Sequence, residues 1–174
     1  MSDELWRDDG IRVRAASSED AAAMAHVHVA SWREAYRRTL VPDEVLDAPD
    51  FVERRERFWS SALTDPRWAA SRVAVAEHRG TVIGIAMSEP VDGLPWTRHL
   101  DVLYVLAAHH GTGVGAALLN AVIDPAEDAA LWVGDPVPRA QAFYRREGFV
   151  PDGTVKIEDG IRAIRMVRLR SDDS

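Results

Sequence analysis

The amino-acid sequence of 174 residues contains no cysteine, a single lysine and no long apolar segment. Without cysteine, the chain forms no disulfide and has neither a thiolate nucleophile nor a zinc site of the cysteine type. Its longest apolar runs are far shorter than the roughly 20 residues that a membrane-spanning helix requires. The N-terminal stretch is acidic and polar and does not resemble a secretory signal. We therefore expect a cytoplasmic protein.

A basic stripe is also missing. The formal net charge is −7, with Asp and Glu spread along the chain, which argues against binding to nucleic acid. An acidic surface suits a cationic partner such as an amine, although net charge bears mainly on solubility. The length indicates one domain, 1–174, with a core over 11–169 and short polar tails.

The spacing of apolar residues predicts the secondary structure. Ser17 or Ser18 suits the N-cap of a first helix, and Pro42 marks the break after it. A second helix contains FVERRERF, whose charges predict a solvated face. The order of elements predicts a mixed α/β domain without the regular alternation of a doubly wound sheet. The predicted strands are 11–17, 71–78, 81–89, 99–107 and 129–133. One or two more strands are predicted after residue 149, including 161–169. The predicted helices are 19–40, 51–62, 113–124 and 138–149.

The segment LYVLAAHHGTGVGAALLNAVID, residues 103–124, has three glycines between a strand and a helix. Glycine allows a positive φ and lets a ligand approach the backbone. The first amides of a helix have no intrahelical partners, and the helix dipole adds a partial positive charge there. Such a helix start binds anions such as phosphate, to which His109 and His110 could add hydrogen bonds.

Two known phosphate-binding motifs have glycines in a similar arrangement. A P-loop requires GxxxxGK[ST], and the absence of lysine from this segment argues against nucleoside triphosphate hydrolysis. The dinucleotide fingerprint G-x-G-x-x-G/A fits literally as Gly111, Gly113 and Ala116. It lies in mid-chain, however, and no βαβαβ continuation follows it. Asp135 is the nearest candidate for the acidic residue expected about 20 positions further on.

Two motifs together resemble the GCN5-related N-acetyltransferase (GNAT) family. HGTGVG (110–115) follows the signature Q/R-x-x-G-x-G/A, with His110 in place of Gln or Arg, after an LYV strand at 103–105. ALWVGDPVPRAQAFYRREGF (130–149) is similar to the later signature of a strand, an N-P-type turn and a helix with A-x-x-F-Y-x-x-x-G-F. Val137 stands where Asn is common. The residues that match in this second motif are Pro138, Ala142 (or Ala140), Phe143, Tyr144, Gly148 and Phe149.

The resemblance covers roughly 11–169 and implies an α/β (α+β) fold. That fold is a three-layer domain with a central mixed, mostly antiparallel sheet of six to seven strands, a splayed strand pair and about four flanking helices. The resemblance also implies acetyl-CoA as co-substrate, no metal, and a primary amine of a small molecule or peptide as acceptor. The amine would attack directly in a ternary complex, since a chain without cysteine forms no acetyl-cysteine. Family members often pair, so a homodimer is also an expectation.

The resemblance further assigns roles to residues of the two motifs. The extended arm of the cofactor would pair with the free edge of the 99–107 strand, as a β-strand would. The N–H of Val105 would polarise the thioester carbonyl, and Tyr144 would protonate the departing thiolate. The residues expected to bind the cofactor are Leu103, Tyr104, Val105, His110, Gly111, Thr112, Gly113, Val114, Gly115, Ala116 and Tyr144.

The acceptor side is less defined. His99 and Asp101 alternate with apolar residues and should project from one face of their strand, where either is a candidate general base. Trp32 and Glu34, on the first helix, would hold a cationic amine by cation–π and charge contacts; ordinary helix packing with a solvated face is the alternative. Histidines at positions 26 and 28 do not share a helix face, so a zinc site is not expected there.

Two other functions compete with acetyl transfer. The chain could keep the coenzyme A cleft as a non-catalytic sensor or scaffold, which the loss of polar groups such as the one at Val137 would favour. It could also be a small dinucleotide-dependent oxidoreductase that uses Gly111, Gly113 and Ala116. Retention of Tyr144 favours the transferase.

Overall fold

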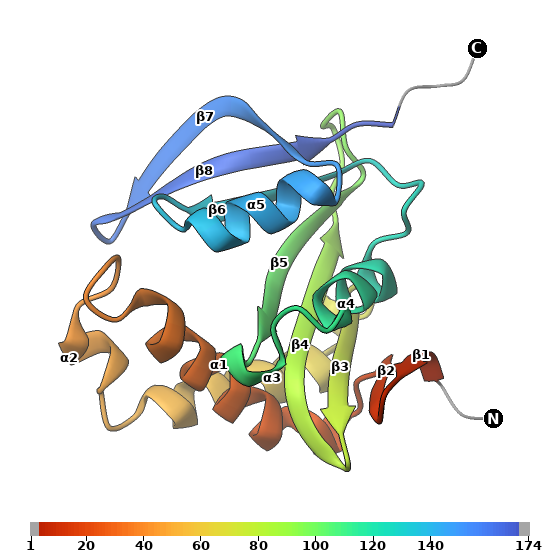
Figure 1. The fold of residues 1–174 in the computed structure, drawn as a ribbon, viewed down its shortest axis with the longest axis vertical. Coiled ribbons are helices and arrows are strands. Elements are labelled where there is room, and N and C mark those ends of the chain that lie inside the picture. The colour runs from red at the N-terminus through yellow and green to blue at the C-terminus, as the bar shows by residue number, and fades with distance from the viewer. Residues whose placement is uncertain (1–3, 171–174) are drawn as a thin grey trace.

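The computed structural model describes residues 4–170, which build one eight-stranded sheet with helices on both faces (Figure 1). The strand order is β1-β2-β3-β4-β5-β6-β8-β7, and every neighbouring pair is antiparallel except β5 and β6. In chain order the elements are β1 (Glu4–Asp8), β2 (Ile11–Ala15), α1 (Ala21–Tyr36), α2 (Asp43–Leu46), α3 (Phe51–Thr64), β3 (Arg72–His78), β4 (Thr81–Pro90), β5 (Arg98–Val105), α4 (Val114–Val122), β6 (Ala129–Gly134), α5 (Pro138–Arg146), β7 (Val150–Glu158) and β8 (Ile161–Arg168).

Three of the hairpins use the same kind of two-residue turn. Asp9–Gly10, Arg79–Gly80 and Asp159–Gly160 all have positive φ at both positions. That backbone matches the right-handed twist of the flanking strands, and a glycine at the second position adopts it without steric cost. These turns fix the pairing of β1 with β2, β3 with β4, and β7 with β8.

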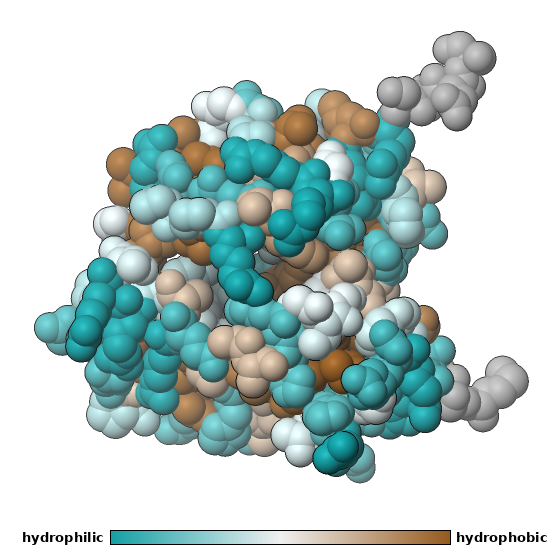
Figure 2. Space-filling model, viewed as in Figure 1, coloured by the Kyte–Doolittle hydropathy of each residue, from teal (hydrophilic) through white to brown (hydrophobic). Residues whose placement is uncertain are grey.

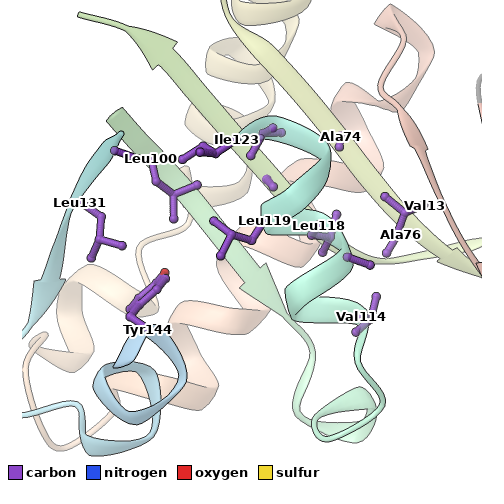
Figure 3. Packing of buried hydrophobic residues seen from close by; sticks show 14 of the residues in the cluster. Val13, Ala74, Ala76, Leu100, Val114, Leu118, Leu119, Ile123, Leu131 and Tyr144 are labelled. Carbon is purple, nitrogen blue, oxygen red and sulfur yellow. The ribbon is translucent and has the colours of Figure 1, made fainter. Parts of the chain in front are cut away.

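The core has two principal apolar layers, one on each face of the sheet. Buried residues of α4, together with Tyr144 and Phe149, pack on one face, and α1 and α3 pack on the other through residues such as Met24 and Trp59. Figure 1 shows α4 and α5 on the near side of the sheet and α1 and α3 behind it. Around α4, Leu118 and Leu119 contact the sheet as Figure 3 shows. The expected three-layer, mostly antiparallel architecture is confirmed.

The structure adds two short elements that the sequence analysis did not predict. Residues 4–8, predicted as a polar tail, form β1, because backbone pairing with β2 does not require apolar side chains. The sheet therefore has eight strands and not six or seven. The first helix ends at Tyr36, whose carbonyl accepts hydrogen bonds from three following N–H groups, and the short α2 comes after this turn. No helix within 4–170 is long and apolar enough to cross a membrane.

Candidate active site

The candidate site lies where the parallel strands β5 and β6 separate. They pair only between 98–100 on β5 and 129–131 on β6. Beyond Leu100, β5 continues to Val105 with β4 on one edge and no strand on the other. The surface is hollowed at this place, between the part that contains α5 and the part that contains α4 (Figures 1 and 2). The splayed pair expected from the family resemblance is therefore present.

The free edge of β5 presents backbone groups of alternate residues. Leu106 donates its N–H to a carbonyl of β4, and Tyr104 pairs with β4 two residues earlier. The alternation of an antiparallel ladder then turns the backbone groups of Leu103 and Val105 toward the open side. Of the three residues predicted to pair with a ligand, Leu103 and Val105 face the gap, and the backbone of Tyr104 is engaged with β4.

The loop before α4 presents its amides to solvent. None of the N–H groups from Gly111 to Ala116 donates to a backbone carbonyl in the described part of the chain, and residues 111–113 are exposed. Gly113 is the N-cap of α4 with φ +85°, a conformation that L side chains rarely adopt. A Cβ on Gly115 would lie 3.3 Å from the ring of Phe143, so this glycine allows α4 and α5 to pack closely. The predicted anion site at the start of α4 is thus open.

Three hydrogen bonds hold this loop against the strand and the first helix. The ring N–H at Nε2 of His110 donates to the carbonyl of Val105 at 2.9 Å. The hydroxyl of Thr112 donates to the carbonyl of His109 at 2.7 Å. The backbone N–H of Ala107 donates to Oε2 of Glu34 at 2.9 Å. His110 therefore contacts the end of β5 through Nε2, and its direct contact with a ligand stays a prediction.

Tyr144 extends from α5 into the space beside the splay. Its side chain is buried and lies near Leu131 and Leu119, with the hydroxyl at the end away from the helix (Figure 3). Burial, together with the nearby Tyr104, raises the pKa of Tyr144 above its ordinary value. The phenol therefore keeps its proton across the physiological pH range.

Two further tyrosines approach the same point from other elements. Tyr36 comes from α1 and Tyr104 from β5, and each influences the titration of the other. Both also lie close enough to Tyr144 for electrostatic coupling. Tyr104 packs on the α1 face of the sheet and Tyr144 on the α4 face. The splay therefore connects the two faces at this point.

The two base candidates lie at the start of the splay. Opposite them, Ser88 pairs with Leu100 and Met87 pairs with Val102, so Asp101 is an extra residue in the ladder. This bulge interrupts the expected alternation, because Leu100 packs on the α4 face and Val102 on the α1 face.

Glu89 joins the two base candidates. It lies opposite His99 in the register of β4 and β5, and its carboxyl group contacts that of Asp101. Protein atoms crowd Asp101 although part of it is exposed to solvent; this crowding and the carboxyl of Glu89 raise the pKa of Asp101 to about 8. Burial, with the charges of Lys156 and Arg165, lowers the pKa of His99. Asp101 is therefore largely protonated at neutral pH, and His99 is neutral.

The two predicted acceptor residues point in different directions. Glu34 contacts the loop before α4, whereas Trp32 contacts the rings of Tyr36 and Phe51 at centroid distances of 5.4 and 5.8 Å. His28 is a core residue that accepts a hydrogen bond from Trp59. Burial and the charge of Arg55 lower its pKa to about 3. No group of residues suited to a metal ion occurs within 4–170.

Sequence reasoning missed Glu89, Tyr36 and Arg55. Glu89 is the last residue of the predicted apolar strand 81–89, and the sequence assigns it no role beyond that boundary. Arg55 belongs to FVERRERF, whose charges predicted a solvated face; Arg54 and Arg57 do pair with nearby carboxylates there. Arg55 instead lies against aromatic rings. Its spacing of one helical turn from the apolar Phe51 and Phe58 was the available signal.

Comparison with known proteins agrees with this geometry. The model of the acetyltransferase (GNAT) family matches residues 22–149. An uncharacterized N-acetyltransferase of Mycobacterium tuberculosis is 34% identical over 140 residues, which cover 78% of this chain and 86% of that protein.

Solved structures show the same fold. PaiA N-acetyltransferase from Thermoplasma acidophilum, in complex with coenzyme A, has a TM-score of 0.71 at 17% identity and covers 90% of this chain and 98% of its own. YncA, a putative acetyltransferase from Salmonella typhimurium with acetyl-CoA, has a TM-score of 0.63 at 20% identity and covers 95% of this chain and 98% of its own. With the family model matching most of its length, the chain belongs to the GNAT family and is an N-acetyltransferase.

Proposed function

We propose that this chain moves the acetyl group of acetyl-CoA to a primary amine of a small molecule or peptide by direct attack in a ternary complex. One observation carries the proposal: the free edge of β5, the open amides before α4 and the hydroxyl of Tyr144 meet at one splay. Two structures with the same fold contain coenzyme A or acetyl-CoA. Membership in the family supports an acyl donor of that kind.

The residues present fit such a donor. The N–H groups from Gly111 to Ala116 are free for a diphosphate at the positive end of α4. Leu103 presents its backbone N–H and carbonyl, and Val105 its N–H, since His110 occupies the carbonyl of Val105; these groups suit the amides of an extended arm, as in strand addition. When bound there, acetyl-CoA supplies a thioester carbonyl, and the N–H of Val105 is the group of β5 placed to polarise it.

Tyr144 is the proposed general acid. Its raised pKa keeps the phenol protonated, so it is able to share or donate its proton as charge develops on the departing sulfur. From residues 4–170 the hydroxyl receives no hydrogen bond that would lower this pKa.

His99 and Asp101 are the proposed acceptors of the amine proton. A neutral His99 is ready to act as a base at pH 7, whereas Asp101 becomes a carboxylate only as the pH approaches about 8. The two alternatives therefore differ in the pH dependence of the rate. An acyl-enzyme on sulfur is excluded because the chain has no cysteine.

Calorimetric titration with acetyl-CoA, followed by a thiol-release assay over a panel of amines, tests the proposal. We expect saturable binding and release of free thiol that depends on the amine. Tyr144→Phe should lower kcat by about 100-fold, in the range usual for loss of a general acid, and leave the affinity for acetyl-CoA unchanged. Absence of binding would refute the proposed donor, and binding without transfer to any amine would favour the sensor alternative.

A further inference from the structure

Arg55 occupies an inward-facing position of α3. The buried residues of this helix are Phe51, Trp59 and Ala62, and Arg55 lies one turn from Phe51 and from Trp59. The stripe of a helix that faces the core is normally apolar. Arg55 therefore places a charged guanidinium at a position of α3 where an apolar side chain is usual.

Aromatic rings surround this guanidinium. Its Cζ lies 5.9 Å from the ring centroid of Trp32, 5.7 Å from that of Phe51 and 6.0 Å from that of Phe58. Aromatic rings at such distances stabilise a cation through their quadrupoles. They offer no acceptor to its N–H groups, which lie in the plane of the guanidinium.

Arg55 makes no side-chain hydrogen bond with any residue of the described range 4–170. Its Nε is buried and makes no hydrogen bond, and over residues 4–170 no carboxylate is close enough to raise its pKa. Burial instead lowers the pKa of Arg55. Arg54 and Arg57 on the same helix pair with Asp50 and Glu53. Arg55 is half-buried and its Nε lacks a partner, which is unfavourable for a charged group, so this arginine differs from its neighbours.

A second unpartnered donor lies beside it. The indole N–H of Trp32 is buried and makes no hydrogen bond within 4–170, although it lies near the hydroxyl of Tyr104 without the geometry of a bond. Most buried donors in folded proteins have a partner. Two neighbouring donors that lack one, from α1 and α3, indicate an acceptor that both can reach.

We propose that the acceptor amine carries a carboxylate and that Arg55 and Trp32 bind this carboxylate. A planar carboxylate matches the two-pronged geometry of a guanidinium, and one guanidinium balances one negative charge. The aromatic walls suit an apolar body on the same molecule. The proposal rests on the proposed acetyl transfer and narrows its acceptor to amino-acid-like compounds.

The position of Tyr104 links this anion site to the splay. Arg55 is close enough to Tyr104 to influence its titration, and Tyr104 in turn influences Tyr144. Arg55 and Tyr144 therefore both lie near the side chain of Tyr104. An acceptor held by its carboxylate at Arg55 would extend along Tyr104 and present its amine toward the splay.

Equilibrium binding of a small carboxylate tests the inference without catalysis. Phenylacetate and its uncharged analogue phenylacetamide are titrated into the protein by calorimetry at constant ionic strength. We expect phenylacetate to bind about 10- to 100-fold more tightly, the range for hydrogen bonds to a charged group. Arg55→Met should abolish this difference, Trp32→Phe should reduce it, and Arg57→Met should preserve it. Equal affinities for the two probes in the wild-type protein would overturn the proposal.

A transfer assay provides a second test and separates the two proposals. L-phenylalanine and phenethylamine differ only in the carboxylate, and the absence of cysteine removes background from protein thiols. We expect kcat/KM to favour L-phenylalanine by at least about tenfold, with Arg55→Met removing the preference mainly through KM. Transfer without preference would overturn the carboxylate site and leave acetyl transfer intact. Carboxylate-selective binding without any transfer would refute the proposed acetyl transfer and support the carboxylate site. Circular dichroism of Arg55→Met and of the milder Arg55→Lys is the control for folding.

Discussion

Glu34 on α1 accepts a hydrogen bond from the backbone N–H of Ala107, 73 residues later, at 2.9 Å. Ala107 begins the turn between β5 and the amides that precede α4. The contact therefore ties the first helix to the loop proposed to bind the diphosphate. It gives Glu34 a positioning role that the sequence, which suggested contact with a cationic amine, did not indicate.

Replacing Glu34 with Ala should weaken acetyl-CoA binding and leave acceptor selectivity unchanged. One hydrogen bond contributes about 0.5–1.5 kcal/mol, so we expect KM for acetyl-CoA to rise by about 2- to 10-fold. Glu34→Gln keeps an oxygen that accepts from Ala107 and is the matched control. Steady-state kinetics with both substrates varied would detect the change. A rise confined to KM for the amine would return Glu34 to the acceptor site.

The pH dependence of kcat/KM should identify the general base. If Asp101 accepts the amine proton, its carboxylate must form first, and the rate should increase through a pKa of about 8. If His99 accepts the amine proton, its lowered pKa means that it is already neutral at pH 7. Titration of the enzyme then causes no further increase in rate above pH 7. Acceptors whose amines titrate outside this range are needed for the measurement.

Asp101→Asn and His99→Gln make the comparison direct. For the Asp101 mechanism, the asparagine variant should lose about 100-fold in rate or more together with the rise near pH 8, and His99→Gln should keep both. The reverse pattern would assign the base to His99. Retention of the full rate and profile in each variant would remove both residues from the proton path.

The stability of the protein should also respond to Asp101. Crowding and the carboxyl of Glu89 raise its pKa to about 8 in the folded state, against about 3.9 in an unfolded chain. A carboxyl group whose pKa is higher in the folded state stabilises the fold fully at pH values below its unfolded-state pKa. This contribution is lost as the pH rises through the folded-state pKa. Asp101→Asn should therefore gain stability relative to wild type as the pH rises from about 4 to about 8. Urea unfolding at pH 4, 7 and 9 measures the trend, and a constant difference across that range would contradict it.

Local residue patterns predicted the part of the site that depends on local backbone. Gly113 was predictable because a glycine between a strand and a helix indicates a positive φ, which the structure has. Tyr144 was placed by its motif on a helix, and the structure brings it to the splay. These assignments need only the residues near them in sequence.

Groups that depend on distant contacts were not predictable in the same way. Glu89 reaches Asp101 only because of the bulge in the pairing of β4 and β5, and a bulge leaves no clear mark in these two segments. Arg55 stands among charged residues that point to solvent, and its contact with Trp32 comes from another helix. Such roles are set by register and helix packing, which one sequence does not display.

Gly113→Ala should damage cofactor binding beyond its effect on stability. Gly113 has φ +85° and no atom near the position of an added Cβ, so the direct cost is backbone strain of about 1–2 kcal/mol. The strain falls at the N-cap of α4, where release would turn the amides away from the anion site. We expect KM for acetyl-CoA to rise by about tenfold or more, as for loss of a hydrogen bond to a charged group. Gly153→Ala on β7 is the matched control, because Gly153 has φ +88° and equally open surroundings; it should lose similar stability and keep its KM. Equal effects on KM in the two variants would mean that the amides before α4 do not bind the cofactor.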